Sequence, residues 1–294
     1  MSGAIAGGIS GGMDGAVVLA ALASALLHAS WNAAVKATPW APRVMTAQMQ
    51  ASALLVLPLL AWGGLPATAA WPWMLGSTLL CVAAVATMLK AYEHGPFGAV
   101  YPLMRASSVL LVLPVASALA HEAPTALGVA GVLLIAAAVA SLAWGSGADR
   151  AFNRHALGWT LLAAACTAGY VVCDAQGVRR AGTPWSYGAG MSVLNAVTWS
   201  LWQWHRGEPW PRERAVWAWG LPSALAAVLS YLLILWAWTH APIAPAAALR
   251  DTSAVFATLL SVWVLKEPLS RRVLLAVGLS AVGAVLIRLG WPAG

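Results

Sequence analysis

The stretch PTALGVAGVLLIAAAVASLAW, residues 124–144, contains no charged side chain and is long enough to cross the apolar core of a bilayer as a helix. Comparable apolar runs recur along the whole chain, separated by short clusters of polar, Gly and Pro residues. They span residues 15–36, 43–63, 71–92, 97–120, 124–144, 156–178, 185–205, 216–240, 243–265 and 269–289. The runs lack the alternation of barrel strands, so helices that satisfy their own amides are expected. The sequence therefore predicts an all-α polytopic membrane protein of about ten transmembrane helices.

The composition does not fit a water-soluble surface. Of the 294 residues, 61% are hydrophobic and 9% are charged, whereas an ordinary soluble domain has roughly a quarter charged residues. The formal net charge is +7, but Lys and Arg are scattered in short loops. Loops that flank membrane spans explain this pattern better than nucleic-acid binding does. We therefore expect the lipid bilayer, and no nucleic acid, as a partner.

Motifs for catalysis, metal binding or nucleotide binding are missing from the sequence. Gly8 to Gly12 fits the hydrolase pattern GxSxG, but no strand precedes it. The three cysteines lie in apolar runs without metal-ligand spacing, and we expect buried thiols at Cys81, Cys166 and Cys173. The sequence predicts no enzyme activity, no metal and no cofactor.

The sequence predicts two similar halves, residues 15–144 and 156–290, which are joined by the polar segment Gly145 to His155. Three pairs of segments match at a spacing of 146 or 145 residues. These are His94-Gly95-Pro96 with His240-Ala241-Pro242, Arg105-Ala106-Ser107-Ser108 with Arg250-Asp251-Thr252-Ser253, and Glu122 with Glu267. An odd number of spans in each half predicts that the second half enters the membrane in the opposite sense, as in inverted-repeat transporters.

These features resemble the drug/metabolite transporter superfamily, specifically its ten-span EamA-type members, over essentially residues 15 to 290. The resemblance rests on the two five-helix halves, on Trp31-Asn32 and Lys36, on the Gly-rich last helix of each half, and on two acidic-Pro turns. The turns are His121-Glu122-Ala123-Pro124 and Lys266-Glu267-Pro268. The resemblance implies a cavity lined by the first four helices of each half, with the fifth helices outside it.

Within that family the chain is most similar to exporters of aromatic and other neutral amino acids, since it lacks the Lys-rich motif of nucleotide-sugar carriers. The resemblance implies a secondary transporter in the plasma (inner) membrane that needs no oligomer. The alternatives are an EamA-type transporter of another small metabolite or drug, an intramembrane enzyme, and a non-transporting membrane receptor.

Polar side chains recur every four residues along the first predicted helix: Ser24, His28, Asn32 and Lys36. This spacing places them on one face, where they either pack against a neighbouring helix or line a cavity. The sixth run repeats the stripe with Cys166, Tyr170 and Asp174. The charge of a carboxylate within a membrane span must be compensated. For Asp174, either an ion pair with Arg179 or Arg180 compensates the charge, or Asp174 binds a substrate or a proton.

Two arginines stand about eight residues into matching predicted helices, too deep to snorkel easily. They are Arg105 and Arg250, and Asp251 is positioned to face Arg105 across the axis between the halves. The cluster is either a structural ion-pair network or part of a binding site. Aromatic walls for a ring-bearing substrate are predicted at Trp31, Tyr92, Tyr101, Tyr170, Tyr187, Trp199, Tyr231 and Trp238.

The orientation in the membrane stays open. Loops on the side of the termini carry three basic residues and those on the opposite side carry eleven, which by the positive-inside rule places the termini outside. The family resemblance implies the reverse. Substrate identity, coupling ion and oligomeric state have no sequence signature here.

Overall fold

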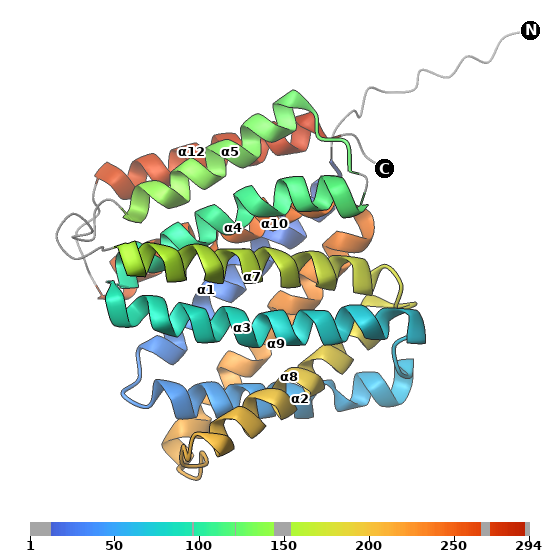
Figure 1. The fold of residues 1–294 in the computed structure, drawn as a ribbon, viewed down its shortest axis with the longest axis vertical. Helices are drawn as coiled ribbons and strands as arrows, with labels where there is room; N and C mark the ends of the chain where they lie inside the picture. The colour runs from blue at the N-terminus through green and yellow to red at the C-terminus, as the bar shows by residue number, and fades with distance from the viewer. Residues whose placement is uncertain (1–12, 96, 121, 144–153, 266–270, 292–294) are drawn as a thin grey trace, which may run out of the picture.

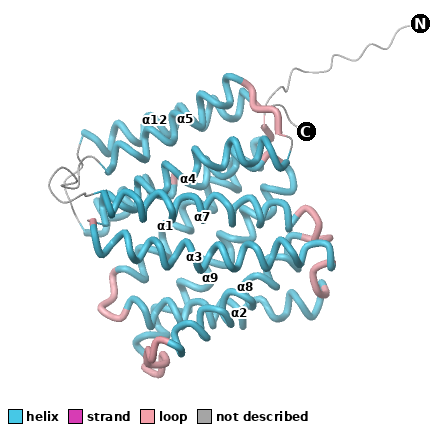
Figure 2. Tube along the Cα trace, in the orientation of Figure 1, coloured by secondary structure: helices cyan, strands magenta, loops and turns pink. Residues whose placement is uncertain are grey.

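The computed structural model describes residues 13–95, 97–120, 122–143, 154–265 and 271–291, and within these ranges the chain is helical without a strand. The first half forms α1 (Gly15–Lys36), α2 (Ala41–Gly63), the short 3₁₀ helix η1 (Thr68–Ala70), α3 (Trp71–His94), α4 (Phe97–Ala120) and α5 (Ala126–Ala143). The second half forms α7 (Arg154–Val178), α8 (Pro184–His205), α9 (Arg214–His240), α10 (Ile243–Asp251), α11 (Ser253–Leu265) and α12 (Arg271–Gly290). Figures 1 and 2 show these helices joined by short loops. The all-α prediction is confirmed.

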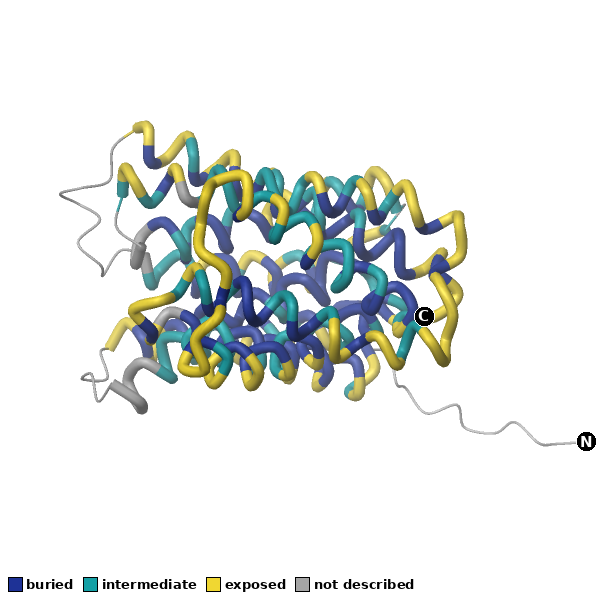
Figure 3. The backbone as a smooth tube through the Cα atoms, turned by 90° about the horizontal axis from the view of Figure 1, so that it is seen from below, coloured by how far each residue is buried: buried dark blue, intermediate teal, exposed yellow. Residues whose placement is uncertain are grey.

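Eight helical segments of the described chain are long and apolar enough to cross a membrane, and the shorter helix Ala126–Leu142 is also apolar. α8 lacks charged residues but is rich in Trp and polar side chains, so it falls short in mean hydropathy. The fold is that of a multi-pass membrane protein, and the count of ten spans remains a prediction. Large leucines face outward, as lipid contact requires; Figure 3 shows exposed residues along the outer helix surfaces and buried residues between the helices.

The predicted run 243–265 is not one helix. α10 ends at Asp251 and α11 begins at Ser253, with Thr252 between them. The Thr252 hydroxyl donates to the Leu249 carbonyl at 2.6 Å, and the Thr252 amide donates to the same carbonyl at 3.3 Å. This i→i−3 bonding competes with the regular helical pattern and tightens the turn.

Contacts between the helix termini define two opposite ends of the bundle. At the terminus end, the Met13 amide donates to the Arg288 carbonyl, and the Ala67 amide donates to the Ala181 carbonyl. At the opposite end, called the basic end here, Arg43 of α2 pairs with Glu213 at the start of α9. The predicted linker, apart from Arg154 and His155, and the Glu267-Pro268 turn lie outside the described residues.

α5 and α12 pack side by side at one edge of the molecule (Figure 1). A Cβ atom on Gly131 would stand 2.7 Å from the Gly283 carbonyl oxygen. Glycine at both positions therefore lets the two backbones approach closely, as small residues do between membrane helices.

The remaining helices pack in pairs drawn from the two halves. α1 packs along α9, and α7 packs along α3. α2 packs along α8, while α4 packs on α7, and α10 and α11 pack on α1. Each of these pairs joins one helix of the first half to one of the second. This arrangement places the functional candidates of both halves around one central space.

Candidate functional site

A cavity of about 1800 Å³ lies among the helices and extends inward from the basic end. Ala37, Arg206 and Arg271 line it near that end, and His28 and Asp174 line it deeper in the bundle. Asp174 is four residues from the last residue of α7 at the terminus end, or roughly 6 Å of helix. The cavity therefore penetrates most of the bundle and stops short of the terminus end.

A buried ion pair joins the two halves beside this cavity. The Arg105 Nη1 atom of α4 donates to the Asp251 Oδ1 atom of α10 at 3.0 Å, and each side chain is 8% exposed. The Arg105 guanidinium also lies 5.4 Å from the centre of the Tyr101 ring. Asp251 thus faces Arg105, which is the arrangement that the matching positions in the sequence indicated.

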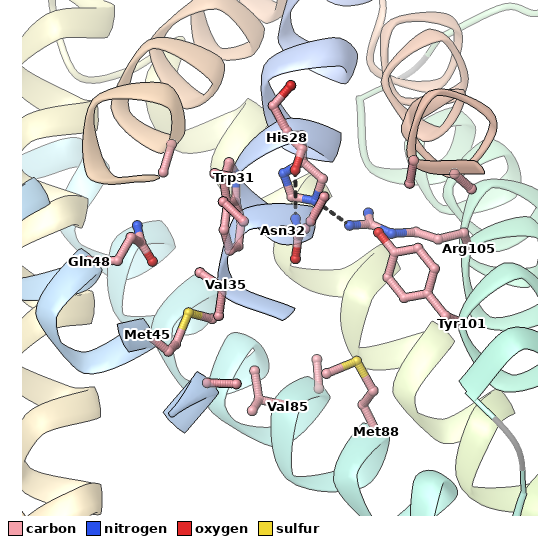
Figure 4. A pocket seen from close by; sticks show the side chains of 18 of the residues that line it. His28, Trp31, Asn32, Val35, Met45, Gln48, Val85, Met88, Tyr101 and Arg105 are labelled. Carbon is pink, nitrogen blue, oxygen red and sulfur yellow. Dashed lines mark hydrogen bonds between the residues drawn. The ribbon is translucent and has the colours of Figure 1, made fainter. Parts of the chain in front are cut away.

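His28 of α1 stands between the two arginines. Arg105 Nη2 lies 2.6 Å from His28 Nε2, and Arg250 Nη2 lies 3.5 Å from His28 Nδ1. Figure 4 shows the first contact and, beside it, Trp31, whose ring centre is 5.1 Å from that of His28. A guanidinium only donates, so His28 accepts from Arg105 through Nε2 and a neutral imidazole then carries its proton on Nδ1.

Asp174 of α7 is compensated by hydroxyl groups rather than by a cation. Ser77 and Tyr187 donate to Oδ1 at 2.6 and 3.1 Å, and Tyr231 donates to Oδ2 at 2.9 Å. The residue is buried, and among the described residues it makes no ion pair. The alternative ion pair with Arg179 or Arg180 is therefore absent from the structure.

Those two arginines have other partners near the terminus end. Arg179 donates to the Trp238 and Ala241 carbonyls at 2.9 and 2.8 Å and lies 3.4 Å from Glu122. Glu122 in turn accepts from the Ile243 amide at 2.6 Å, at the start of α10. Together these contacts tie the ends of α4, α7, α9 and α10 beyond the deep end of the cavity, so they close the terminus end.

Most of the predicted site residues come together at this cavity. Its lining includes His28, Trp31, Asn32, Tyr92, Tyr101, Arg105, Tyr170, Asp174, Tyr231 and Arg250. Three predicted residues lie elsewhere. Asp251 is behind the lining, paired with Arg105. Trp238 and Tyr187 are buried in the core between helices, 1% and 0% exposed.

Sequence reasoning missed several cavity residues. Ser77, which donates to Asp174, is one of several polar residues in a mainly apolar helix, and no regular spacing singled it out. Tyr187 was predicted as an aromatic wall of the cavity, but its hydroxyl donates to Asp174 from outside the cavity lining, and nothing in the sequence indicated that contact. At the basic end, the lining includes the aromatic candidate Trp199 and five residues that the sequence did not single out: Trp202, Gln203, Arg206, Arg271 and Arg272.

The cysteines are free and half-buried, and Cys81 lines the cavity. In the described part of the chain, no group of three or more His, Cys, Asp or Glu side chains is placed to hold a metal ion.

Residues 155–289 match the model of the EamA-like transporter family. The EamA match begins in α7 and ends in α12, so it covers the second half of the chain. That half therefore carries the sequence signature of a family of membrane transporters. No curated protein matches the chain.

A solved structure described only as "Crystal structure of protein" has a TM-score of 0.73 to this chain at 19% sequence identity. The alignment covers 92% of this chain and 94% of that one. The two proteins share a fold over nearly their whole length, including the first half, which the EamA match does not reach.

Proposed function

We propose that this chain is a secondary transporter that exports small metabolites, with neutral and aromatic amino acids as its substrates. The observation that carries the proposal is the cavity between the halves, whose deep part combines two arginines, a carboxylate and aromatic side chains. Charged groups within a bundle of membrane helices are costly and mark substrate pathways. The EamA-like second half supports transport as the function of that pathway.

Aromatic side chains favour a ring-bearing substrate over a purely polar one. Trp31, Tyr101, Tyr170 and Tyr231 line the same cavity as Arg105 and Arg250. Rings offer flat apolar surfaces, and their edges and faces pair well with another ring. A neutral aromatic amino acid combines such a ring with one positive and one negative group, so it complements this lining.

We take the two halves, residues 15–144 and 156–290, to be inverted copies. The packing supports this: α1 packs on α9 as α7 packs on α3, and the α2–α8 and α5–α12 pairs each join equivalent helices. One pair breaks the symmetry, because α2 packs along α9 whereas α8 touches α3 only slightly. In an inverted-repeat transporter, such asymmetry accompanies an opening to one side at a time.

We place the basic end in the cytoplasm and the protein in the plasma (inner) membrane. Among the described residues, nine basic residues lie at or near that end, against three at the other, which supports this orientation. The cavity extends inward from the same end, so substrate would load from the cytoplasm, as export requires.

Resistance to toxic amino-acid analogues tests the proposed function. Cells that overproduce the protein should tolerate an aromatic analogue such as fluorophenylalanine better than cells with an empty vector, because export lowers its internal concentration. The unaltered analogue should be recovered outside the cells. Recovery of a chemically altered analogue would support an enzyme instead, and resistance only to unrelated toxic compounds would support a transporter of other metabolites or drugs.

Labelling of Cys81 tests the orientation, because this thiol lines the cavity. In a variant with Cys166→Ala and Cys173→Ala, a membrane-impermeant maleimide should label Cys81 in inside-out vesicles and leave it unlabelled in intact cells. Excess substrate should slow the reaction. Labelling only in intact cells would reverse the assigned orientation.

A further inference from the structure

The four charged groups at the deep part of the cavity are not equally paired. Arg105 and Asp251 neutralise each other at 3.0 Å, and both side chains are almost fully buried. Arg250 and Asp174 both line the cavity, yet neither belongs to an ion pair among the described residues. One cation and one anion are therefore left facing the same cavity.

The Arg250 guanidinium has no carboxylate partner among the described residues. Its Nε atom is buried without a hydrogen-bond partner, and its Nη2 atom lies 3.5 Å from His28 Nδ1. Because His28 accepts from Arg105 through Nε2, a neutral ring has its proton on Nδ1 and offers Arg250 nothing to accept a hydrogen bond. Buried donors in native proteins are almost always satisfied, so this guanidinium is available to bind an anionic group that enters the cavity.

The break between α10 and α11 leaves a second unpartnered polar group close to Arg250 in the chain. α11 begins at Ser253, three residues after Arg250, and lines the cavity through Ala254 and Ala257. The buried Ser253 hydroxyl has no hydrogen-bond partner among the described residues.

Asp174 lacks a positively charged partner among the described residues. Its three partners are the neutral hydroxyls of Ser77, Tyr187 and Tyr231, of which two use Oδ1 and one uses Oδ2. An ionised carboxylate has about four acceptor positions, so Oδ2 can take one further donor from the cavity. An ammonium group would supply both the hydrogen bond and the missing positive charge.

We propose that Arg250 binds the carboxylate of a zwitterionic substrate and Asp174 binds its ammonium group, while the Arg105–Asp251 pair holds the adjoining helices. This rests on the proposed function and deepens it, because it assigns each pole of the substrate to one residue. The ring of the substrate then lies against the aromatic lining near His28 and Trp31.

The test uses purified protein in proteoliposomes and three labelled compounds. Phenylalanine has both charged groups, phenethylamine lacks the carboxylate, and 3-phenylpropionate lacks the ammonium group. The carboxylate preference is the ratio of kcat/KM for phenylalanine to that for phenethylamine. The ammonium preference is the corresponding ratio for phenylalanine against 3-phenylpropionate.

Arg250→Gln should lower the carboxylate preference by at least about tenfold and leave the ammonium preference within about twofold, because sites lose most discrimination at the group whose partner is removed. Asp174→Asn should do the reverse. Exposed residues outside the cavity lining serve as matched controls: Arg214→Gln and Glu93→Gln should leave both preferences unchanged.

Arg250→Lys covers the case in which Arg250→Gln does not fold. It keeps the charge, so the carboxylate preference should survive, but the KM for phenylalanine should rise because an ammonium cannot form the two-pronged contact of a guanidinium. An unchanged KM in Arg250→Lys, or equal changes of both preferences in each variant, overturns the assignment of poles. If wild-type vesicles take up phenylalanine and the variants keep both preferences, the inference alone fails. If wild-type vesicles take up none of the three compounds, the proposed function fails and the inference fails with it.

Discussion

Replacing Asp251 by Asn should strongly destabilise the fold, because it strands the charge of Arg105. The two side chains are 3.0 Å apart and each is 8% exposed, so water screens them little. Asn has nearly the shape of Asp but no charge, and the guanidinium would keep its charge beside a neutral amide. Removing one partner of a fully buried pair costs about 3 to 5 kcal/mol. Since His28 remains as an acceptor at 2.6 Å, we expect about 3 kcal/mol, at the lower end of that range.

The free energy of unfolding is measured by titrating the detergent-purified protein with a denaturing detergent and following tryptophan fluorescence. Arg105→Gln, Asp251→Asn and the double variant form a cycle, and the double variant should recover at least about 1 kcal/mol relative to the sum of the single changes. Lys90 and Glu93 provide the exposed control pair, with side chains 54% and 56% exposed, and Glu93→Gln should cost less than about 1 kcal/mol. A loss in Asp251→Asn no larger than in this control, or additive single changes, would refute the structural role of the pair.

Two further stability predictions use matched neighbours. Gly131→Ala should lower the free energy of unfolding by about 1 to 3 kcal/mol, because its Cβ would stand 2.7 Å from the Gly283 carbonyl oxygen. A Cβ at Gly278 would meet no atom within 4 Å, so the control Gly278→Ala should be neutral or slightly stabilising. Equal thermal unfolding midpoints for the two variants would contradict the close packing of α5 on α12. Arg179→Gln should cost about 1.5 to 3 kcal/mol, because Arg179 donates to two backbone carbonyls of a neighbouring segment, whereas Arg180→Gln removes a contact only with Gln176 of its own helix and a ring contact. The same unfolding titration compares them, and a larger loss in Arg180→Gln would show that the terminus end is held together in another way.

The helix boundaries were largely predictable because the transition from apolar to polar residues coincides with the ends of the helices. The runs 15–36 and 97–120 match α1 and α4, and most other ends differ by one or two residues. The break at Thr252 was not predictable from hydropathy, since Asp251 and Thr252 lie within an otherwise apolar run. It depends on the hydroxyl bond to Leu249 and on the distant partner Arg105.

Periodicity predicted which residues share a helix face but not where that face points. The stripe through His28 and the position of Arg250 led to the cavity because charges avoid lipid. Trp238 had no such constraint, and its helix turns it into the core instead. The partners of Asp174 come from α3, α8 and α9, and a pairing among four helices depends on their relative rotation, which the sequence pattern does not contain.

Uptake of labelled phenylalanine into proteoliposomes is the decisive measurement of transport, because only the protein, lipid and substrate are present. We predict saturable uptake above that of protein-free vesicles, inhibition by unlabelled aromatic amino acids, and recovery of unaltered phenylalanine from the lumen. Uptake equal to that of protein-free vesicles, for phenylalanine and for other neutral amino acids, would contradict amino-acid transport by this chain.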